Sequence, residues 1–127
     1  MAKWQNDLML DAALGYVDDC TILTVCSAQP TTYTEAITTY KLADVVMTAG
    51  AGNGDYTLAN GDVSGRKLTV VQQSAVPIDT SGTATHVALC ITASSTLVYV
   101  TTCTSQSLTS GGTVTVPNWD IEIADAA

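Results

Sequence analysis

Turn-forming residues cut most of this chain into short segments, and their spacing limits the folds open to it. After residue 49, clusters of Gly, Asn, Asp and Ser recur roughly every 8–14 residues. The runs between these clusters are rich in Thr and Val, whose branching at Cβ stiffens χ1 and suits a pleated surface. The pattern predicts a mainly β protein, an antiparallel β-sandwich or small barrel of about seven strands.

The expected strands are the extended runs that these turns separate. They span residues 20–27, 40–48, 56–59, 66–75, 83–92, 97–104 and 113–124. Apolar residues do not alternate strictly in the first run, so we expect both of its faces to be covered. The two runs that flank residues 93–96 predict the clearest hairpin. Pro117 interrupts the last run, and its missing N–H predicts an edge strand or a bulge there.

The N-terminal region has the only convincing helical pattern, apart from a short helical turn expected around residues 34–37. Within residues 5–18, apolar side chains recur at helical spacing, and Asn6 or Asp7 can cap the first turn. The expected apolar face consists of Leu8, Ala12, Leu14 and Val17, widened by Met9, Ala13 and Tyr16. We expect a single domain over residues 1–127, with an N-terminal arm and helix in 1–19 and a β-sandwich in 20–127.

The charge balance narrows the classes of partner. Four Lys and Arg residues stand against twelve Asp and Glu in a chain of 127 residues, which gives a net charge of −8. Because phosphate binding needs a cationic footprint, we expect neither nucleic acid nor a membrane surface as a partner. No apolar run approaches the ~18 residues of a membrane-spanning helix, and no secretory signal is visible. Only 13% of the residues are charged, so much of the surface must be uncharged, which suits close packing against a fixed neighbour.

The four cysteines, Cys20, Cys26, Cys90 and Cys103, lack the spacing of a metal or redox motif. Without an export signal, the favoured interpretation is four reduced and mostly buried thiols that behave as small hydrophobic groups. A disulfide between strands or between subunits is the alternative.

Candidate catalytic residues are sparse and do not combine. The only histidine, His86, shares a strand face with Cys90, but four residues of strand hold them roughly 13 Å apart, too far for direct proton transfer. Asp120 and Glu122 share one face of the last run, where a solvent-exposed face is favoured over a carboxylate pair. The segment AGNGDYTLANGD departs from calcium-loop spacing, which leaves only a weak calcium site as an alternative. We therefore expect a protein that is not an enzyme and holds no cofactor or metal.

Several segments spread over nearly the whole chain have a familiar order. They are LMLDAALGYV, TVCSAQPTTYTEA, NGDVSGRKLTV, SGTATHVALCITASSTLVYVTTCTSQSLTSGGTV and VPNWDIEIAD. In this order the chain resembles small virion structural proteins of tailed bacteriophages, most closely a capsid decoration (cement) protein. The resemblance implies a β-rich module that is made in the host bacterial cytoplasm and binds the outside of an icosahedral capsid, where it holds neighbouring capsomers together. It implies the major capsid protein and neighbouring copies of the chain itself as partners.

Large aromatic residues outside the expected strand centres are the candidate contact residues, because each is either a lid over the core or an anchor in a partner. The expected partner interface consists of Trp4 in the N-terminal arm, Tyr33 in the Thr-rich loop, and Trp119, Ile121 and Ile123 at the C-terminal edge. An exposed edge strand is a further way to pair with a neighbour's sheet.

Three rival interpretations stay open. The first is another phage particle component, from the neck, tail or fibre base. The second is a carbohydrate-binding β-sandwich module, which requires Trp4, Tyr33 and Trp119 on one exposed platform. The third is a small hydrolase that uses His86.

Overall fold

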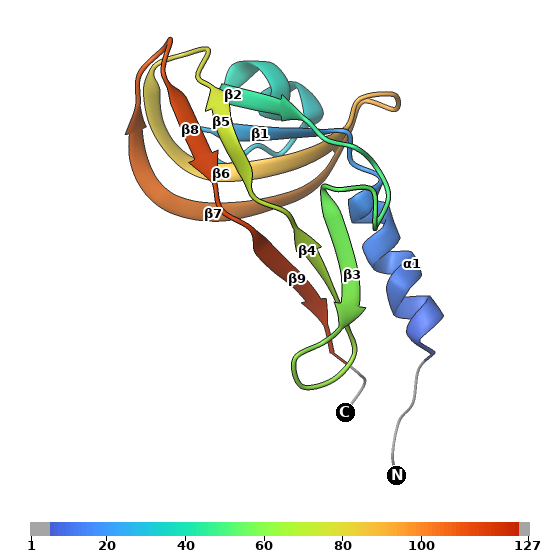
Figure 1. The fold of residues 1–127 in the computed structure, drawn as a ribbon. Coiled ribbons are helices and arrows are strands. Elements are labelled where there is room, and N and C mark those ends of the chain that lie inside the picture. Colours follow the sequence, from blue (N-terminus) through green and yellow to red (C-terminus); the bar gives the residue numbers. More distant parts are fainter. Residues whose placement is uncertain (1–5, 125–127) are drawn as a thin grey trace.

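Nine strands in three antiparallel sheets make up most of the computed structural model, which describes residues 6–124 (Figure 1). The strands are β1 (Ile22–Cys26), β2 (Lys41–Val46), β3 (Tyr56–Asn60), β4 (Arg66–Val70), β5 (Gln73–Pro77), β6 (Gly82–Ile91), β7 (Thr96–Leu108), β8 (Thr113–Val116) and β9 (Trp119–Ile123). The helical elements are α1 (Asp7–Asp18) and a short π-helix, η1 (Glu35–Thr39). The predicted mainly β, antiparallel architecture with one N-terminal helix is confirmed.

The sheets form two layers. A four-stranded sheet, in the order β2-β1-β6-β7, contains the long curved hairpin of β6 and β7. A two-stranded sheet (β5-β8) crosses in front of it in Figure 1, and a three-stranded sheet (β3-β4-β9) continues below. The main hydrophobic core fills the space between the layers and includes Leu23 and Leu89 from one side and Tyr56, Leu68 and Val76 from the other.

The structure has nine strands where the sequence predicted about seven, because two predicted strands are each broken in the middle. Residues 66–75 divide into β4 and β5, and residues 113–124 divide into β8 and β9. The breaks face each other, since Val70 pairs with Trp119 on one side and Gln73 with Val116 on the other. Pro117 has no N–H to donate at this point, so the interruption that it predicts is present.

Strand β1 is covered on both faces, as its lack of alternation predicted. Leu23 and Val25 point into the main core, whereas Cys26 belongs to a second, smaller cluster on the opposite face. Ala36 of η1 closes that second cluster, and Tyr33 and Ile37 pack at its margin. The helical turn expected around residues 34–37 is therefore η1, the element that shields this face of the sheet.

Helix α1 packs against the sheets through a different face from the one the sequence predicted. Its first turn is capped by Asn6, whose side chain accepts a hydrogen bond from the Leu8 N–H at 2.8 Å. Leu10 and Leu14 are buried, whereas Leu8 lies in solvent. Apolar residues surround most of this helix, so the periodicity alone did not determine which of two adjacent stripes enters the core.

A buried hydrogen bond joins the end of the helical region to the three-stranded sheet. The Tyr56 hydroxyl, on β3, donates to the Cys20 carbonyl at 2.9 Å, and both residues are fully buried. Replacing Tyr56 by Phe leaves that carbonyl without a partner and should lower the free energy of unfolding by about 1–3 kcal/mol. Urea denaturation measures the change. Tyr16→Phe is the matched control, because its exposed side chain makes the same substitution worth less than about 0.5 kcal/mol. Equal effects of the two substitutions would contradict this account.

Candidate binding surfaces

The predicted contact residues of the C-terminal edge lie together on one face of β9. Trp119, Ile121 and Ile123 are half-buried and pack against the main core. Asp120 and Glu122 point the other way, where Asp120 accepts a hydrogen bond from the Thr69 hydroxyl at 2.6 Å. The predicted solvent-exposed face of this strand is therefore confirmed, and the aromatic and aliphatic residues form its inner face.

The remaining predicted contact residues do not join this group. Tyr33 packs in the second cluster, on the side of the four-stranded sheet opposite to Trp119. Trp4 lies outside the described residues. An exposed platform that includes both Tyr33 and Trp119, which the carbohydrate-binding interpretation requires, is therefore not formed.

A groove with a volume of about 390 Å³ lies between β7 and the segment from β8 to the start of β9. It is lined by Val25, Ala84, Val87, Thr101, Thr102, Cys103, Thr104, Gln106, Val114, Thr115, Val116, Pro117, Asn118 and Trp119. The lining contains no charged side chain, so an occupant of this groove would be apolar or neutral and polar.

Trp119 at the edge of this groove has an unusual hydrogen-bonding state. Its Nε1 is buried and, within the described residues, has no hydrogen-bond acceptor. A buried donor without an acceptor costs about 1–3 kcal/mol, which offsets part of the stabilisation that the indole ring contributes by packing.

Two substitutions of Trp119 should therefore differ sharply. Trp119→Phe removes the unpaired N–H together with part of the ring, so the free energy of unfolding should change by less than about 1 kcal/mol. Trp119→Ala leaves a void beside the core and should cost about 2–3 kcal/mol, below the range for a fully buried Trp. Chemical denaturation of both variants tests this, and a Phe variant as unstable as the Ala variant would show that the N–H has an acceptor.

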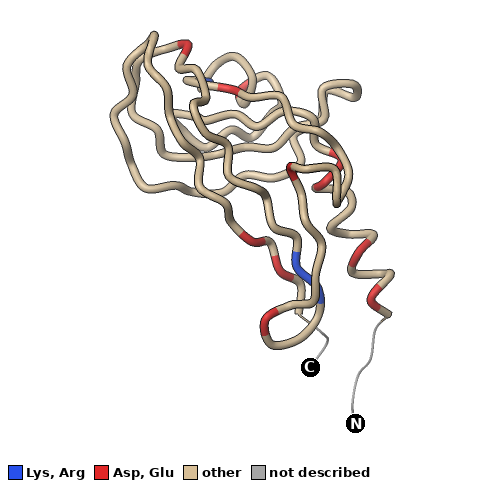
Figure 2. The backbone as a smooth tube through the Cα atoms, viewed as in Figure 1, with Lys and Arg blue, Asp and Glu red and all other residues tan. Residues whose placement is uncertain are grey.

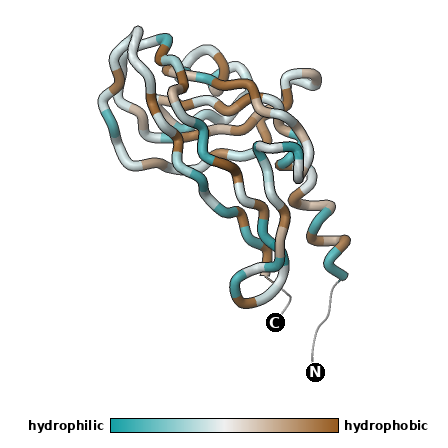
Figure 3. The backbone as a smooth tube through the Cα atoms, viewed as in Figure 1, coloured by the Kyte–Doolittle hydropathy of each residue, from teal (hydrophilic) through white to brown (hydrophobic). Residues whose placement is uncertain are grey.

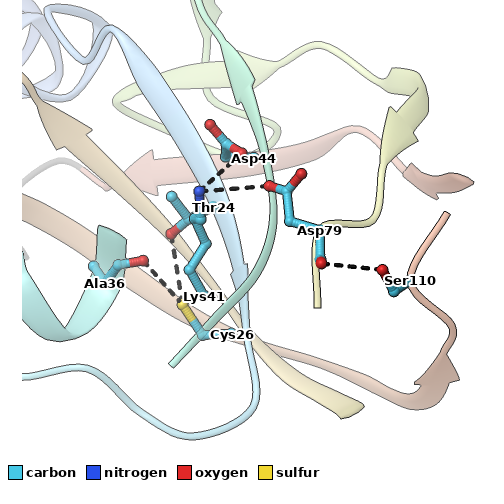
Figure 4. Close-up of polar contacts among 7 residues, drawn as sticks. All are labelled: Thr24, Cys26, Ala36, Lys41, Asp44, Asp79 and Ser110. Carbon is cyan, nitrogen blue, oxygen red and sulfur yellow. Dashed lines mark hydrogen bonds and ion pairs between the residues drawn. The ribbon is translucent and has the colours of Figure 1, made fainter. Parts of the chain in front are cut away.

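The four cysteines are free thiols, and all except the half-buried Cys103 are buried, as the favoured interpretation predicted. Burial raises the pKa of the Cys20 thiol to about 12 and that of Cys90 to about 11. The Cys26 thiol donates to the Ala36 carbonyl at 3.6 Å and lies 3.5 Å from the Thr24 hydroxyl (Figure 4). These thiols are poor nucleophiles near neutral pH, because the thiolate is the reactive form.

His86 faces a cysteine that the sequence analysis did not consider. In the pairing of β1 with β6, Cys26 lies directly opposite His86. The imidazole Nδ1, however, is 2.8 Å from the Thr85 hydroxyl, and the Cys26 thiol contacts Ala36 and Thr24 instead. Burial also raises the pKa of Cys26, which is the reverse of the activation that a cysteine nucleophile needs.

The raised thiol pKa values predict that the protein loses stability in alkali. An unfolded thiol releases its proton near 9.0, whereas Cys20 and Cys90 hold theirs to about 12 and 11 in the folded state. Between these values the folded state binds more protons, so the free energy of unfolding should fall as pH rises, by roughly 1 kcal/mol per pH unit for each thiol. Urea titrations from pH 8 to 10 measure the slope. A Cys90→Ala variant should show a shallower slope, and a flat profile in the unmodified protein would refute the assignment.

The cations of the described residues are all paired within the chain. Lys41 lies 3.2 Å from Asp44 and 3.4 Å from Asp79 (Figure 4), and Arg66 lies 2.7 Å from Asp11. Lys67 is paired with Asp62 at 2.7 Å and with Asp120 at 3.7 Å. Figure 2 shows how few blue segments interrupt the red and tan trace.

Strand β7 forms an open edge of the four-stranded sheet. It has 13 residues, and β6 is its only strand partner among the described residues. Its sequence, TLVYVTTCTSQSL, contains no charged residue and no proline. The opposite edge differs, because the N–H groups of Asp79 and Thr80 donate to the Leu42 carbonyl of β2 at 2.8 and 3.1 Å.

Helix α1 presents an exposed apolar stripe that the sequence analysis did not separate from the core face. Leu8, Met9 and Tyr16 are 74%, 57% and 53% exposed. The i, i+8 spacing of Leu8 and Tyr16 was a signal for this stripe, but the analysis assigned both residues to a single apolar face.

Comparisons with known proteins return no matching family model, curated protein or solved structure. In residues 6–124, no helix is both long and apolar enough to cross a membrane.

Proposed function

We propose that the chain is a non-enzymatic virion structural protein that binds the outer surface of a tailed-phage capsid and stabilises contacts between capsomers. The resemblance to decoration proteins suggests this role, and the open edge of β7 is the structural observation that supports it best. Natural β proteins protect their sheet edges with charges, prolines or short strands. The length of β7 and its uncharged sequence leave an edge suited to accept a neighbouring strand.

The mechanism is surface complementarity repeated over a lattice. A strand of the shell adds to β7 through main-chain hydrogen bonds, and the adjoining uncharged groove receives alternate side chains of that strand. Each contact is modest, but a protein that bridges two capsomers gains from the high effective concentration of the second site. The major capsid protein supplies the strand, and neighbouring copies of the chain occupy equivalent sites.

Lysines on the open edge test this proposal. Thr102 and Thr104 of β7 are exposed, so Thr102→Lys with Thr104→Lys should leave the fold intact while placing two charges where a strand would add. We expect binding to empty shells, assembled from the major capsid protein of the phage that encodes the chain, to weaken by about tenfold or more. Co-sedimentation with a count of bound copies per shell measures it, and saturation at an icosahedral stoichiometry is expected for the unmodified protein.

The matched control adds the same charges elsewhere. Ala93→Lys with Thr80→Lys places two lysines at exposed positions outside β7 and should bind like the unmodified protein. If the folded, unmodified protein does not bind shells, the capsid role is wrong, and a neck, tail or fibre-base position takes its place. If it binds and the β7 variant binds equally well, the capsid role stands and β7 is not the docking edge.

A further inference from the structure

The outer face of α1 is a second surface that the docking of β7 does not use. The exposed large hydrophobic residues of the described chain are Leu8, Met9, Tyr16, Val46 and Val63. Three of these five residues lie on this one helix. Ala12 and Ala13 are also exposed and lie between them, so the apolar surface is continuous over the length of the helix. Figure 3 shows apolar and polar segments alternating along α1, which lies at the margin of the molecule.

The stripe is framed by negative charge. Asp7 is exposed in the first turn, Asp19 is exposed at the C-terminal cap, and the helix has no basic residue in its last turn. Figure 2 shows the acidic positions along α1. Arg66 pairs with Asp11 on the inner side of the helix and is already occupied there. An apolar stripe with acidic ends is the result.

This charge pattern argues against a second copy of the chain as the partner. Lys41, Arg66 and Lys67, the cations of residues 6–124, are each held in an ion pair within the chain. Two α1 helices packed face to face would bring their carboxylates together without a free cation from these residues between them. Such like-charge contact opposes association, whereas a cationic partner would complement it.

We infer that the outer face of α1 docks into an apolar groove of the capsid protein whose rim carries Lys or Arg side chains. An amphipathic helix seated in a groove places anchors at i, i+4 and i+8, which are the positions of Leu8, Ala12 and Tyr16. Asp7 and Asp19 then meet the basic rim at the two ends of the helix. This inference rests on the proposed capsid role, and it adds a second contact of different chemistry to the pairing of β7.

The apolar part of the contact is tested with a triple variant. Leu8→Gln, Met9→Gln and Tyr16→Gln together remove the anchors at exposed positions, so the melting temperature should not change. Affinity for the empty shells should fall by about tenfold or more. Val46→Gln with Val63→Gln is the matched control, since these side chains are 78% and 97% exposed and lie outside α1. This control should bind like the unmodified protein.

The charged part of the contact is tested by salt. Raising the ionic strength from about 0.05 to 0.5 M shortens the screening length and should weaken binding of the unmodified protein. An Asp7→Asn and Asp19→Asn variant should bind more weakly at low salt and lose most of this salt dependence. Circular dichroism checks that the variant keeps its helix, because Asp7 also lies in the favourable first turn.

The outcomes separate this inference from the capsid role. Shell binding by the unmodified protein together with full binding by the triple variant overturns the inference and leaves the capsid role standing. Absence of shell binding by the unmodified protein overturns both. Analytical ultracentrifugation gives a further check, because a dimer of the unmodified protein that the triple variant abolishes would make a second copy the occupant and overturn the basic-groove partner.

Discussion

The burial of β1 on both faces is the constraint around which the rest of the molecule is arranged. Leu23 and Val25 enter the core between the two layers, while Thr24 and Cys26 are equally buried on the other side. A strand covered on both faces needs a second layer for each face. The sheets β5-β8 and β3-β4-β9 provide one layer, and η1 provides the other. The thiol of Cys26 fits this role because it is small, apolar and able to donate to the Ala36 carbonyl.

Much of the architecture follows from local signals in the sequence. The turn clusters and the Thr- and Val-rich runs predict the mainly β class, and the flanks of residues 93–96 predict the β6–β7 hairpin. The interruption at Pro117 was predictable from its missing N–H. Its counterpart between Val70 and Gln73 was not, because that break follows from pairing with a strand more than forty residues away in sequence. Pairing between distant strands leaves no local signal.

The candidate surfaces were less predictable for the same reason. Trp119 was noticed as a large aromatic residue, but only the fold shows that its Nε1 is buried without an acceptor in the described chain. Leu8 and Leu10 are both leucines in one helix, and only the packing of α1 on the sheets exposes one and buries the other. The open edge of β7 likewise depends on strand order, which a sequence pattern does not specify.

The pairing of β9 with β4 also has a consequence for how the fold is reached. Arg66 lies opposite Ile123 in this pair, so the two strands are separated by more than fifty residues that include the whole β6–β7 hairpin. Closing such a long loop is entropically costly, and contacts between distant segments form late in folding. Until β9 has been synthesised, β4 pairs with β3 alone and its other side stays unprotected. A nascent chain is therefore most prone to misassociate at β4, during the interval in which the hairpin is complete and β9 has yet to arrive.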